Sequence, residues 1–222
     1  MKRCFIFAAG TFYGLREAPR AGDVTIAADA GLHNCRSAGI EPELVIGDFD
    51  SMAQPPRGGC VVAPVEKDDT DTMLAVREGL ARGCRTFYIY GGTGGVRLDH
   101  TLANLQTLAF LRRHGARGYL YDRDFVYTVL ENETLTLRRQ VEWGLVSLFA
   151  MSGTQQDVTL EGLQYPLAHA DVTGDFPIGV SNHFIADTAR ITCGSGLLLV
   201  GWQLPPLTET PADRSQAAPP AR

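Results

Sequence analysis

The sequence lacks any long apolar run and any excess of positive charge. None of its apolar stretches approaches the roughly 20 residues that span a bilayer, so no membrane segment is predicted. The net charge is −5, with 20 Lys and Arg against 25 Asp and Glu. Because a nucleic-acid binder needs a basic face that neutralises phosphates, no nucleic-acid partner is expected. A nucleotide enzyme stays compatible with this charge, since a metal ion can supply positive charge locally.

Cysteine is also scarce, and its five copies are scattered. The sequence has no C-x-x-C pair, which argues against a zinc site and against a disulfide framework. Cys4, Cys60 and Cys193 stand in apolar, strand-like surroundings that are typical of buried free thiols in a reducing compartment. The apolar run near Met1 is too short for a secretory signal, so the sequence predicts a cytoplasmic protein. No G-x-S-x-G element or suitable Cys/His pair supports covalent hydrolase chemistry.

The first half of the chain alternates short β-rich runs with helical patterns. Strands are expected at residues 3–9, 24–28, 43–46, 59–63, 86–90 and 117–121, and helices at 30–38, 70–82 and 98–114. In the last helix, leucines at three- and four-residue steps predict one apolar face, formed by Leu98, Leu102, Leu105, Leu108 and Leu111. This alternation predicts an α/β domain with a mostly parallel sheet over residues 1–122.

After residue 122 the pattern changes to short alternating runs separated by polar, glycine-containing turns. Strands are expected at residues 125–130, 134–138, 145–150, 157–160, 185–192 and 197–202. Such a series predicts an all-β sandwich C-terminal domain over residues 123–204. A disordered tail is expected over residues 205–222, which are rich in proline, alanine and polar side chains.

Two acidic clusters follow strand-like runs. Asp48 and Asp50 come directly after an apolar strand and a glycine, at the edge where open α/β sheets bind ligands. Asp71 ends a second cluster, Lys67-Asp68-Asp69-Thr70-Asp71, which opens a helix. Each cluster alone is also typical of a polar turn or a helix cap. Several carboxylates crowded at one edge need a cation, however, so together they predict a magnesium site.

A glycine-rich segment follows the strand expected at residues 86–90. It reads Gly91-Gly92-Thr93-Gly94-Gly95-Val96-Arg97-Leu98-Asp99-His100, and it is neither a Walker A loop nor a dinucleotide fingerprint. Its glycines allow a close approach of backbone to ligand, and amides at the following helix start can bind phosphate oxygens. Arg97 can bridge such oxygens as a charged fork. His100 and Asn104 lie one helical turn apart, so both can face the same site; His100 can equally serve only as a cap of its helix.

Two weaker candidates remain. Asp29 follows the strand expected at residues 24–28, where it either joins the site or caps the next helix. Ser181 and Asn182, within the all-β half, form either a turn dipeptide or a pair that hydrogen-bonds a small organic substrate.

These elements, in this order and spacing, resemble the thiamine pyrophosphokinase family. The likeness rests on Ala28-Asp29-Ala30-Gly31, Gly47-Asp48-Phe49-Asp50-Ser51, Lys67-Asp68-Asp69-Thr70-Asp71, the glycine-rich segment and Ser181-Asn182. The chain departs from the family pattern at Val96, which separates the second glycine pair from Arg97, and at Ala30, where the family usually has glycine.

The resemblance implies a homodimeric enzyme that transfers the diphosphate of ATP to the hydroxyl of thiamine, giving thiamine diphosphate and AMP. Our hypothesis for the mechanism is that Asp48, Asp50 and Asp71 hold Mg²⁺, with Asp71 or Asp99 as the candidate base. Nucleotide contacts are then expected from Asp29, Gly92, Gly94, Gly95, Arg97, His100 and Asn104. Ser181 and Asn182 are expected to contact thiamine from the partner subunit. Two alternatives stay open: a related diphosphokinase acting on a hydroxymethyl pterin, and a non-catalytic Mg-ATP sensor.

Overall fold

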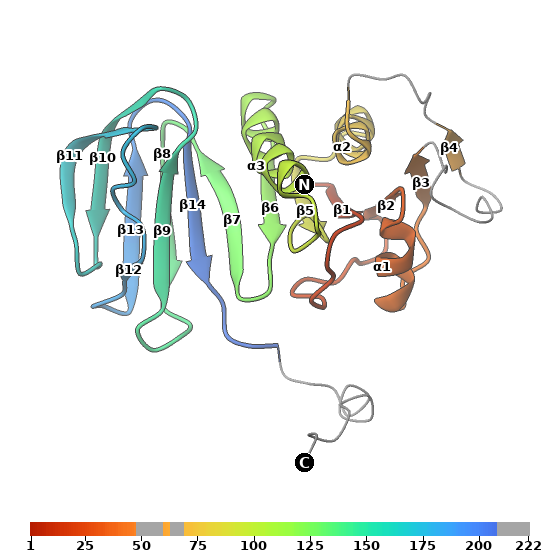
Figure 1. Cartoon of the computed structure of the whole chain (residues 1–222), viewed down its shortest axis with the longest axis horizontal. Helices are drawn as coiled ribbons and strands as arrows, with labels where there is room; N and C mark the ends of the chain where they lie inside the picture. The colour runs from red at the N-terminus through yellow and green to blue at the C-terminus, as the bar shows by residue number, and fades with distance from the viewer. Residues whose placement is uncertain (48–59, 63–68, 208–222) are drawn as a thin grey trace, which may run out of the picture.

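The computed structural model of the chain describes residues 1–47, the backbone of 60–62, and residues 69–207. Its first half contains a six-stranded parallel sheet in the order β6-β5-β1-β2-β3-β4 (Figure 1). The strands are β1 (Arg3–Phe7), β2 (Val24–Ala28), β3 (Leu44–Gly47), β4 (Cys60–Val62), β5 (Thr86–Tyr90) and β6 (Arg117–Tyr121). The central strand β1 is apolar on both faces, as buried parallel strands are.

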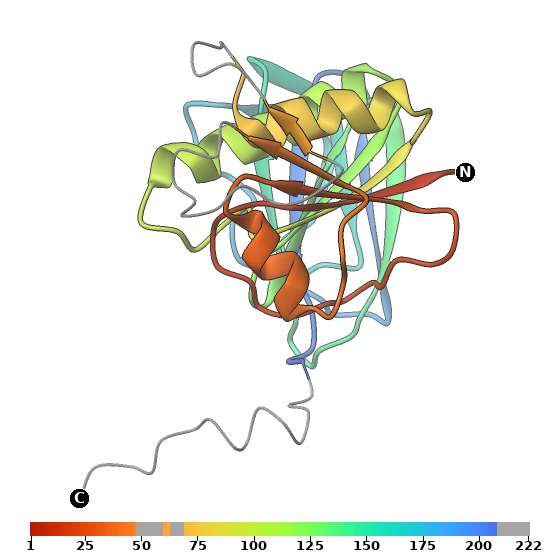
Figure 2. The ribbon, with the colours of Figure 1, turned by 90° about the vertical axis from the view of Figure 1, so that its right-hand side faces the viewer.

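Three helices cover the two faces of this sheet (Figure 2). On one face, α2 (Asp71–Ala81) and α3 (Leu98–Arg113) pack on a core that includes Ile6 and Ile89. On the other face lies α1 (Gly31–Ser37), against the core that includes Phe7. The start of α2 is fixed by Thr70, whose hydroxyl accepts a hydrogen bond from the Met73 amide at 3.2 Å.

The same sheet continues beyond residue 122 as an antiparallel array. Strands β7 (Phe125–Leu130), β14 (Leu198–Gln203), β9 (Leu145–Ala150) and β12 (Asn182–His183) extend it to ten strands. A second, four-stranded antiparallel sheet contains β8 (Glu133–Arg138), β10 (Thr154–Glu161), β11 (Leu167–Thr173) and β13 (Thr188–Cys193). Apolar side chains of both sheets fill the space between them. The predicted fold class, an α/β half followed by an all-β sandwich, is confirmed.

An ion-pair cluster joins the α/β half to the sandwich. Glu133, the first residue of β8, accepts a hydrogen bond from Arg117 of β6. Its other carboxylate oxygen lies 3.1 Å from Nε of Arg112 in α3. All three side chains are about three-quarters buried, so the cluster resists screening by solvent better than a surface pair does.

Several predicted elements need correction. The leucine face of α3 is buried only in its later turns: Leu108 and Leu111 are buried, whereas Leu98 is 70% and Leu102 is 54% exposed. The strand expected at 157–160 runs over Thr154–Glu161 with irregular register, and β11 and β12 were not predicted. No helix in the described ranges 1–47 and 69–207 is both long and apolar enough to cross a membrane.

Strand directions place the two halves of the predicted site at one edge. The parallel strands end where β7 begins, because β6 and β7 are antiparallel neighbours. Following β7, β14 and β9 in turn brings the start of β9 back to that edge, where Asn182 of β12 pairs with Val146. Five strand spacings separate β12 from β5, which at about 4.8 Å each is about 24 Å.

Candidate functional site

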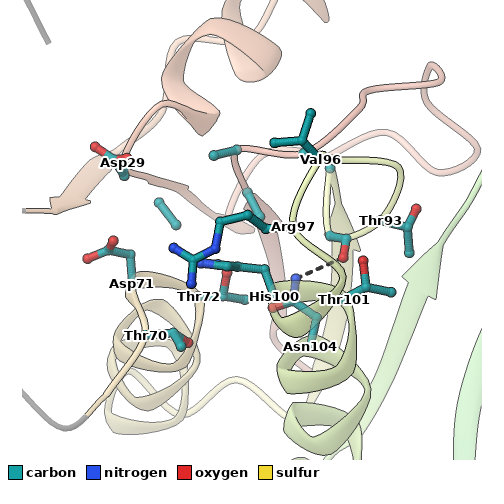
Figure 3. Close-up of a pocket in the computed structure, with 17 residues that line it drawn as sticks. Asp29, Thr70, Asp71, Thr72, Thr93, Val96, Arg97, His100, Thr101 and Asn104 are labelled. Atoms are coloured by element: carbon teal, nitrogen blue, oxygen red, sulfur yellow. Dashed lines mark hydrogen bonds between the residues drawn. The ribbon is translucent and has the colours of Figure 1, made fainter. Parts of the chain in front are cut away.

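A pocket of about 290 Å³ opens at the carboxyl edge of the parallel strands (Figure 3). Its walls come from the segments that follow β1, β2 and β5 and from the first turns of α2 and α3. The carboxyl edge of an open α/β sheet is where such folds bind ligands. The pocket therefore lies where the sequence predicted a site.

Two loops form one wall of the pocket and are paired to each other. The β1–β5 ladder continues past the strand ends: the Gly10 amide donates to the Gly91 carbonyl at 2.7 Å, and the Thr11 amide to the Thr93 carbonyl at 2.9 Å. The Thr11 hydroxyl adds a bond of 2.7 Å to the carbonyl of Gly94. Gly91 and Gly94 have φ angles of 66° and 69°, which side chains disfavour. The segment after β5 is thus held rigidly against the segment after β1.

Several amides of the glycine-rich segment have no acceptor within the part of the chain that the structure describes. Among the described residues, no acceptor is found for the N–H groups of Gly92, Thr93, Gly94 and Gly95. Gly92 and Thr93 are nevertheless buried. A buried N–H without a partner is rare in folded proteins, and a run of such groups forms an anion-binding concavity. Such a segment can bind an anion such as a phosphate group.

Two carboxylates line the pocket on the side away from the glycine-rich segment (Figure 3). Asp29 follows β2 with a φ of 48°, and its amide donates to the Ile46 carbonyl of the β3 strand at 2.7 Å. Asp71 is the first residue of α2. Two of the predicted metal ligands, Asp48 and Asp50, lie outside the described residues. Within the described ranges, no group of three His, Cys, Asp or Glu side chains that could hold a metal ion occurs.

Arg97 and Asp99 form an exposed pair at the start of α3. Nε of Arg97 donates to Oδ1 of Asp99 at 3.2 Å, and a second guanidinium N–H bonds the same carboxylate. This hydrogen bond lowers the pKa of Asp99 and raises the pKa of Arg97. Arg97 lines the pocket, whereas Asp99 is not among the lining residues. The structure thus brings Arg97 to the site and gives Asp99 the role of its partner.

His100 and Asn104 both line the pocket, as their helical spacing predicted. His100 is exposed, while Asn104 is buried and donates from Nδ2 to the Gly92 carbonyl at 2.8 Å (Figure 3). Asn104 therefore holds the glycine-rich segment in place. Gly92 and Gly95 line the pocket directly.

Ser181 and Asn182 do not reach this pocket within one chain, since about 24 Å of sheet lies between them and β5. Asn182 is only 1% exposed, and three hydrogen bonds hold its side-chain amide. Nδ2 donates to the Tyr165 carbonyl at 2.7 Å, and Oδ1 accepts from the Tyr165 and His183 amides, both at 3.0 Å. Ser181 is exposed, with a φ of 58°.

Sequence reasoning missed two polar side chains that support the pocket. Asn34 of α1 bonds the segment after β1, and Asp122 accepts a bond of 2.7 Å from the hydroxyl of the lining residue Thr93. Neither residue stands in a recognisable motif. Their contacts are with residues 24 or more positions away, so no local pattern could have indicated them.

Comparison with known proteins identifies the family. Residues 16–120 match the family model "Thiamin pyrophosphokinase, catalytic domain", and residues 132–198 match "Thiamin pyrophosphokinase, vitamin B1 binding domain". The chain belongs to the thiamine pyrophosphokinase family. The predicted resemblance is confirmed. Most of the pocket lies in the catalytic match, whereas Ser181 and Asn182 lie in the vitamin B1 binding match.

Individual relatives agree with the family models. The thiamine pyrophosphokinase of Bacillus subtilis (strain 168) is 28% identical over 182 residues, covering 79% of this chain and 85% of the relative. A crystal structure of the Bacillus subtilis enzyme has a TM-score of 0.82 at 25% identity, covering 92% of this chain and all of that one. The structure from Geobacillus thermodenitrificans has a TM-score of 0.78 at 27% identity, covering 90% and 97%.

Proposed function

We propose that this chain transfers the diphosphate group of ATP to the hydroxyl of thiamine, giving thiamine diphosphate and AMP. The observation that carries the proposal is the run of amides from Gly92 to Gly95, which lack an acceptor among the described residues. Three residues of this run, Gly92, Thr93 and Gly95, line the pocket together with Asp29 and Asp71. Such an arrangement suits a polyphosphate with its counter-ion. The family membership supplies the thiamine half of the reaction.

In this proposal the glycine-rich segment cradles the phosphates. The amides of Gly92, Gly94 and Gly95 donate to phosphate oxygens, and Arg97 exchanges its bond to Asp99 for a phosphate when ATP binds. The exchange is inexpensive because both partners of that ion pair are well exposed. His100 and Asn104 border the nucleotide, Asn104 through the loop that it holds.

Aspartate carboxylates suit Mg²⁺, but three of them do not fill its six coordination positions. We propose Asp48, Asp50 and Asp71 as its protein ligands, since Mg²⁺ prefers a few carboxylates together with substrate phosphates. Gly47, the residue before Asp48, packs against Asp29, because a Cβ added to Gly47 would lie 3.1 Å from the Cα of Asp29. The bound ion would supply neutralisation of charge on the transferring group. Of the two candidate bases, Asp71 lines the pocket and Asp99 does not.

A homodimer would bring the thiamine residues to the nucleotide pocket. The separation between Ser181 and β5 within one chain supports this, as do two exposed apolar surfaces. One, formed by Val96, Leu98 and Leu102, borders the pocket; the other contains Trp143 and Tyr165, whose rings contact His183 beside Asn182. Exposed apolar surfaces of this kind are typical of interfaces. We assign thiamine contact to Ser181 and a supporting role to Asn182.

We also propose that the protein is cytoplasmic and that it has two domains. Buried free thiols at Cys4, Cys35, Cys84 and Cys193 support the reducing cytoplasm as the compartment, while the Cys60 side chain lies outside the described part. The family-model limits support domains near residues 1–122 and 123–204, with 205–222 as a tail.

The test is chromatography of the purified protein after incubation with ATP, Mg²⁺ and thiamine. We expect thiamine diphosphate and AMP in equal amounts, with neither formed when thiamine is omitted or EDTA is added. ADP with thiamine monophosphate would refute diphosphate transfer. Product only with a hydroxymethyl pterin, or Mg-ATP binding with no turnover, would refute the thiamine assignment.

A further inference from the structure

Whether the pocket wall formed by the segments after β1 and β5 presents N–H groups or carbonyl oxygens to a ligand depends on where its carbonyl groups point. We call this property the polarity of the wall. A loop that binds phosphate through its N–H groups must keep its carbonyl oxygens turned away, since these would repel the anion. The carbonyls of Gly91, Thr93 and Gly94 are occupied by the Gly10 and Thr11 bonds described above. Three further carbonyls, those of Ala8, Gly10 and Gly92, are bound by side chains instead.

Asn34 binds two of these three carbonyls. Its Nδ2 donates to the Ala8 oxygen at 2.7 Å and to the Gly10 oxygen at 2.8 Å. The same nitrogen lies at the junction with the second loop, because a Cβ added to Gly91 would come within 2.8 Å of it. One amide group thus uses both its protons on the segment after β1 while contacting the segment after β5. Asn104 does the equivalent for Gly92 from the other side.

We propose that Asn34 is a positioning residue that sets the polarity of the phosphate-binding wall: it holds the Ala8 and Gly10 carbonyls away from the pocket, so that the N–H groups of Gly92 to Gly95 face the phosphates. The proposal rests on the proposed function. It assigns no contact between Asn34 and substrate. Asn34 acts through the paired loops, whose alignment depends on Gly10.

Replacing Asn34 by aspartate keeps the shape of the side chain but turns its attraction to the Ala8 and Gly10 carbonyls into repulsion. An ionised carboxylate has no proton to donate, so two favourable bonds become repulsions with the Ala8 and Gly10 oxygens. The segment after β1 then has to move, and a negative charge stands near the phosphate site. Asn34→Ala removes the two bonds without adding charge. Both changes weaken binding of a polyphosphate and leave binding of the uncharged nucleoside nearly unchanged.

The test is calorimetric titration of the full chain with Mg-ATP and, separately, with adenosine, in the absence of thiamine. Because Asn34→Ala removes two hydrogen bonds, it should weaken Mg-ATP binding by about 30-fold, and Asn34→Asp by more. Adenosine affinity should change by less than about twofold. His33→Ala, which alters the exposed neighbour on α1, should match the wild type with both ligands.

Equal weakening of Mg-ATP binding and adenosine binding would overturn the proposal. It would mean that Asn34 maintains the fold as a whole and does not set the polarity of the phosphate-binding wall. Unchanged Mg-ATP binding in both variants would overturn it too. If Asn34→Asp unfolds, Asn34→Ser, which keeps one donor, is measured instead and should show a smaller selective loss. If the wild type forms no thiamine diphosphate but the selective loss of Mg-ATP binding is observed, the proposed reaction fails and the positioning role stands.

Discussion

Replacing Gly10 by alanine should separate the two paired loops. An added Cβ would lie 2.5 Å from the Gly91 oxygen and 2.5 Å from the Thr93 oxygen, which is 0.5 Å inside the 3.0 Å limit that real Cβ atoms respect. Both atoms belong to the backbone, so neither can rotate away. The segments must therefore move apart, which breaks or stretches the bonds from Gly10 to Gly91 and from Thr11 to Thr93.

The loss of stability and of activity in Gly10→Ala can be estimated from these contacts. Overpacking in a tight site costs about 1–3 kcal/mol, and two weakened hydrogen bonds add about 1 kcal/mol. We expect the free energy of unfolding to fall by about 2–4 kcal/mol, a large part of the typical total of about 5–15 kcal/mol. Misaligned amides should also lower kcat/KM for ATP by about 100-fold, which corresponds to about 2.7 kcal/mol of lost transition-state binding.

Urea denaturation followed by tryptophan fluorescence measures the first quantity, and steady-state kinetics with varied ATP measures the second. Gly174→Ala is the matched control, since a Cβ there would meet nothing closer than 3.8 Å. If Gly10→Ala changes the free energy of unfolding by less than about 0.5 kcal/mol and retains kcat/KM, the close pairing of the loops is not required, and the reasoning is refuted.

Three other predictions concern charged residues. Asp71→Asn should lower kcat by at least about 100-fold with an unchanged melting temperature; wild-type turnover, assayed as thiamine diphosphate formation, would contradict the role of this carboxylate. Glu133→Gln should lower the free energy of unfolding in urea by about 1–3 kcal/mol, because its two arginine partners, each about three-quarters buried, lose their counter-charge; a change within error would show that the cluster is dispensable. Burial works against the charge of Asp23, but hydrogen bonds from Arg3 and from a backbone amide lower its pKa overall. Its stabilising contribution is therefore present above the ordinary pKa of about 3.9 and is lost as the pH falls through the lower folded value; Asp23→Asn should flatten this part of the stability–pH curve, and an unchanged curve would count against the pair.

Local pattern predicted most of the secondary structure. Strands β2, β5, β6, β7 and β9 have the expected bounds, and each helix is within one residue of its expected ends. These segments carry their signal in adjacent residues, as apolar runs or as helical spacing. β11 gave no such signal, because its exposed residues do not alternate with buried ones and His169 adopts a φ of 50°. β12 has only two residues, too few for a period to appear.

The candidate site divides in the same way. Sequence motifs indicated Asp29, Asp71 and Arg97, because each follows a strand or opens a helix at the carboxyl edge of the sheet, and all three line the pocket. The exposure of Leu98 could not be read from the helical period, which shows that a face is apolar but not what covers it. The hydrogen bonds of Asn34 were equally invisible, since their acceptors lie 24 and 26 residues away.

By itself, the sequence determined the fold class, the family and the sheet edge at which the pocket lies, because strand–helix alternation and strand-end motifs are local in the chain. Tertiary structure alone decided that one ten-stranded sheet runs through both halves and that Ser181 lies about 24 Å along it from β5. It also decided which loop amides have no acceptor among residues 1–47 and 69–207, because that depends on how the carbonyls of two distant segments are paired. Pairing between segments is set by packing in three dimensions, and neighbouring residues in the chain do not encode it.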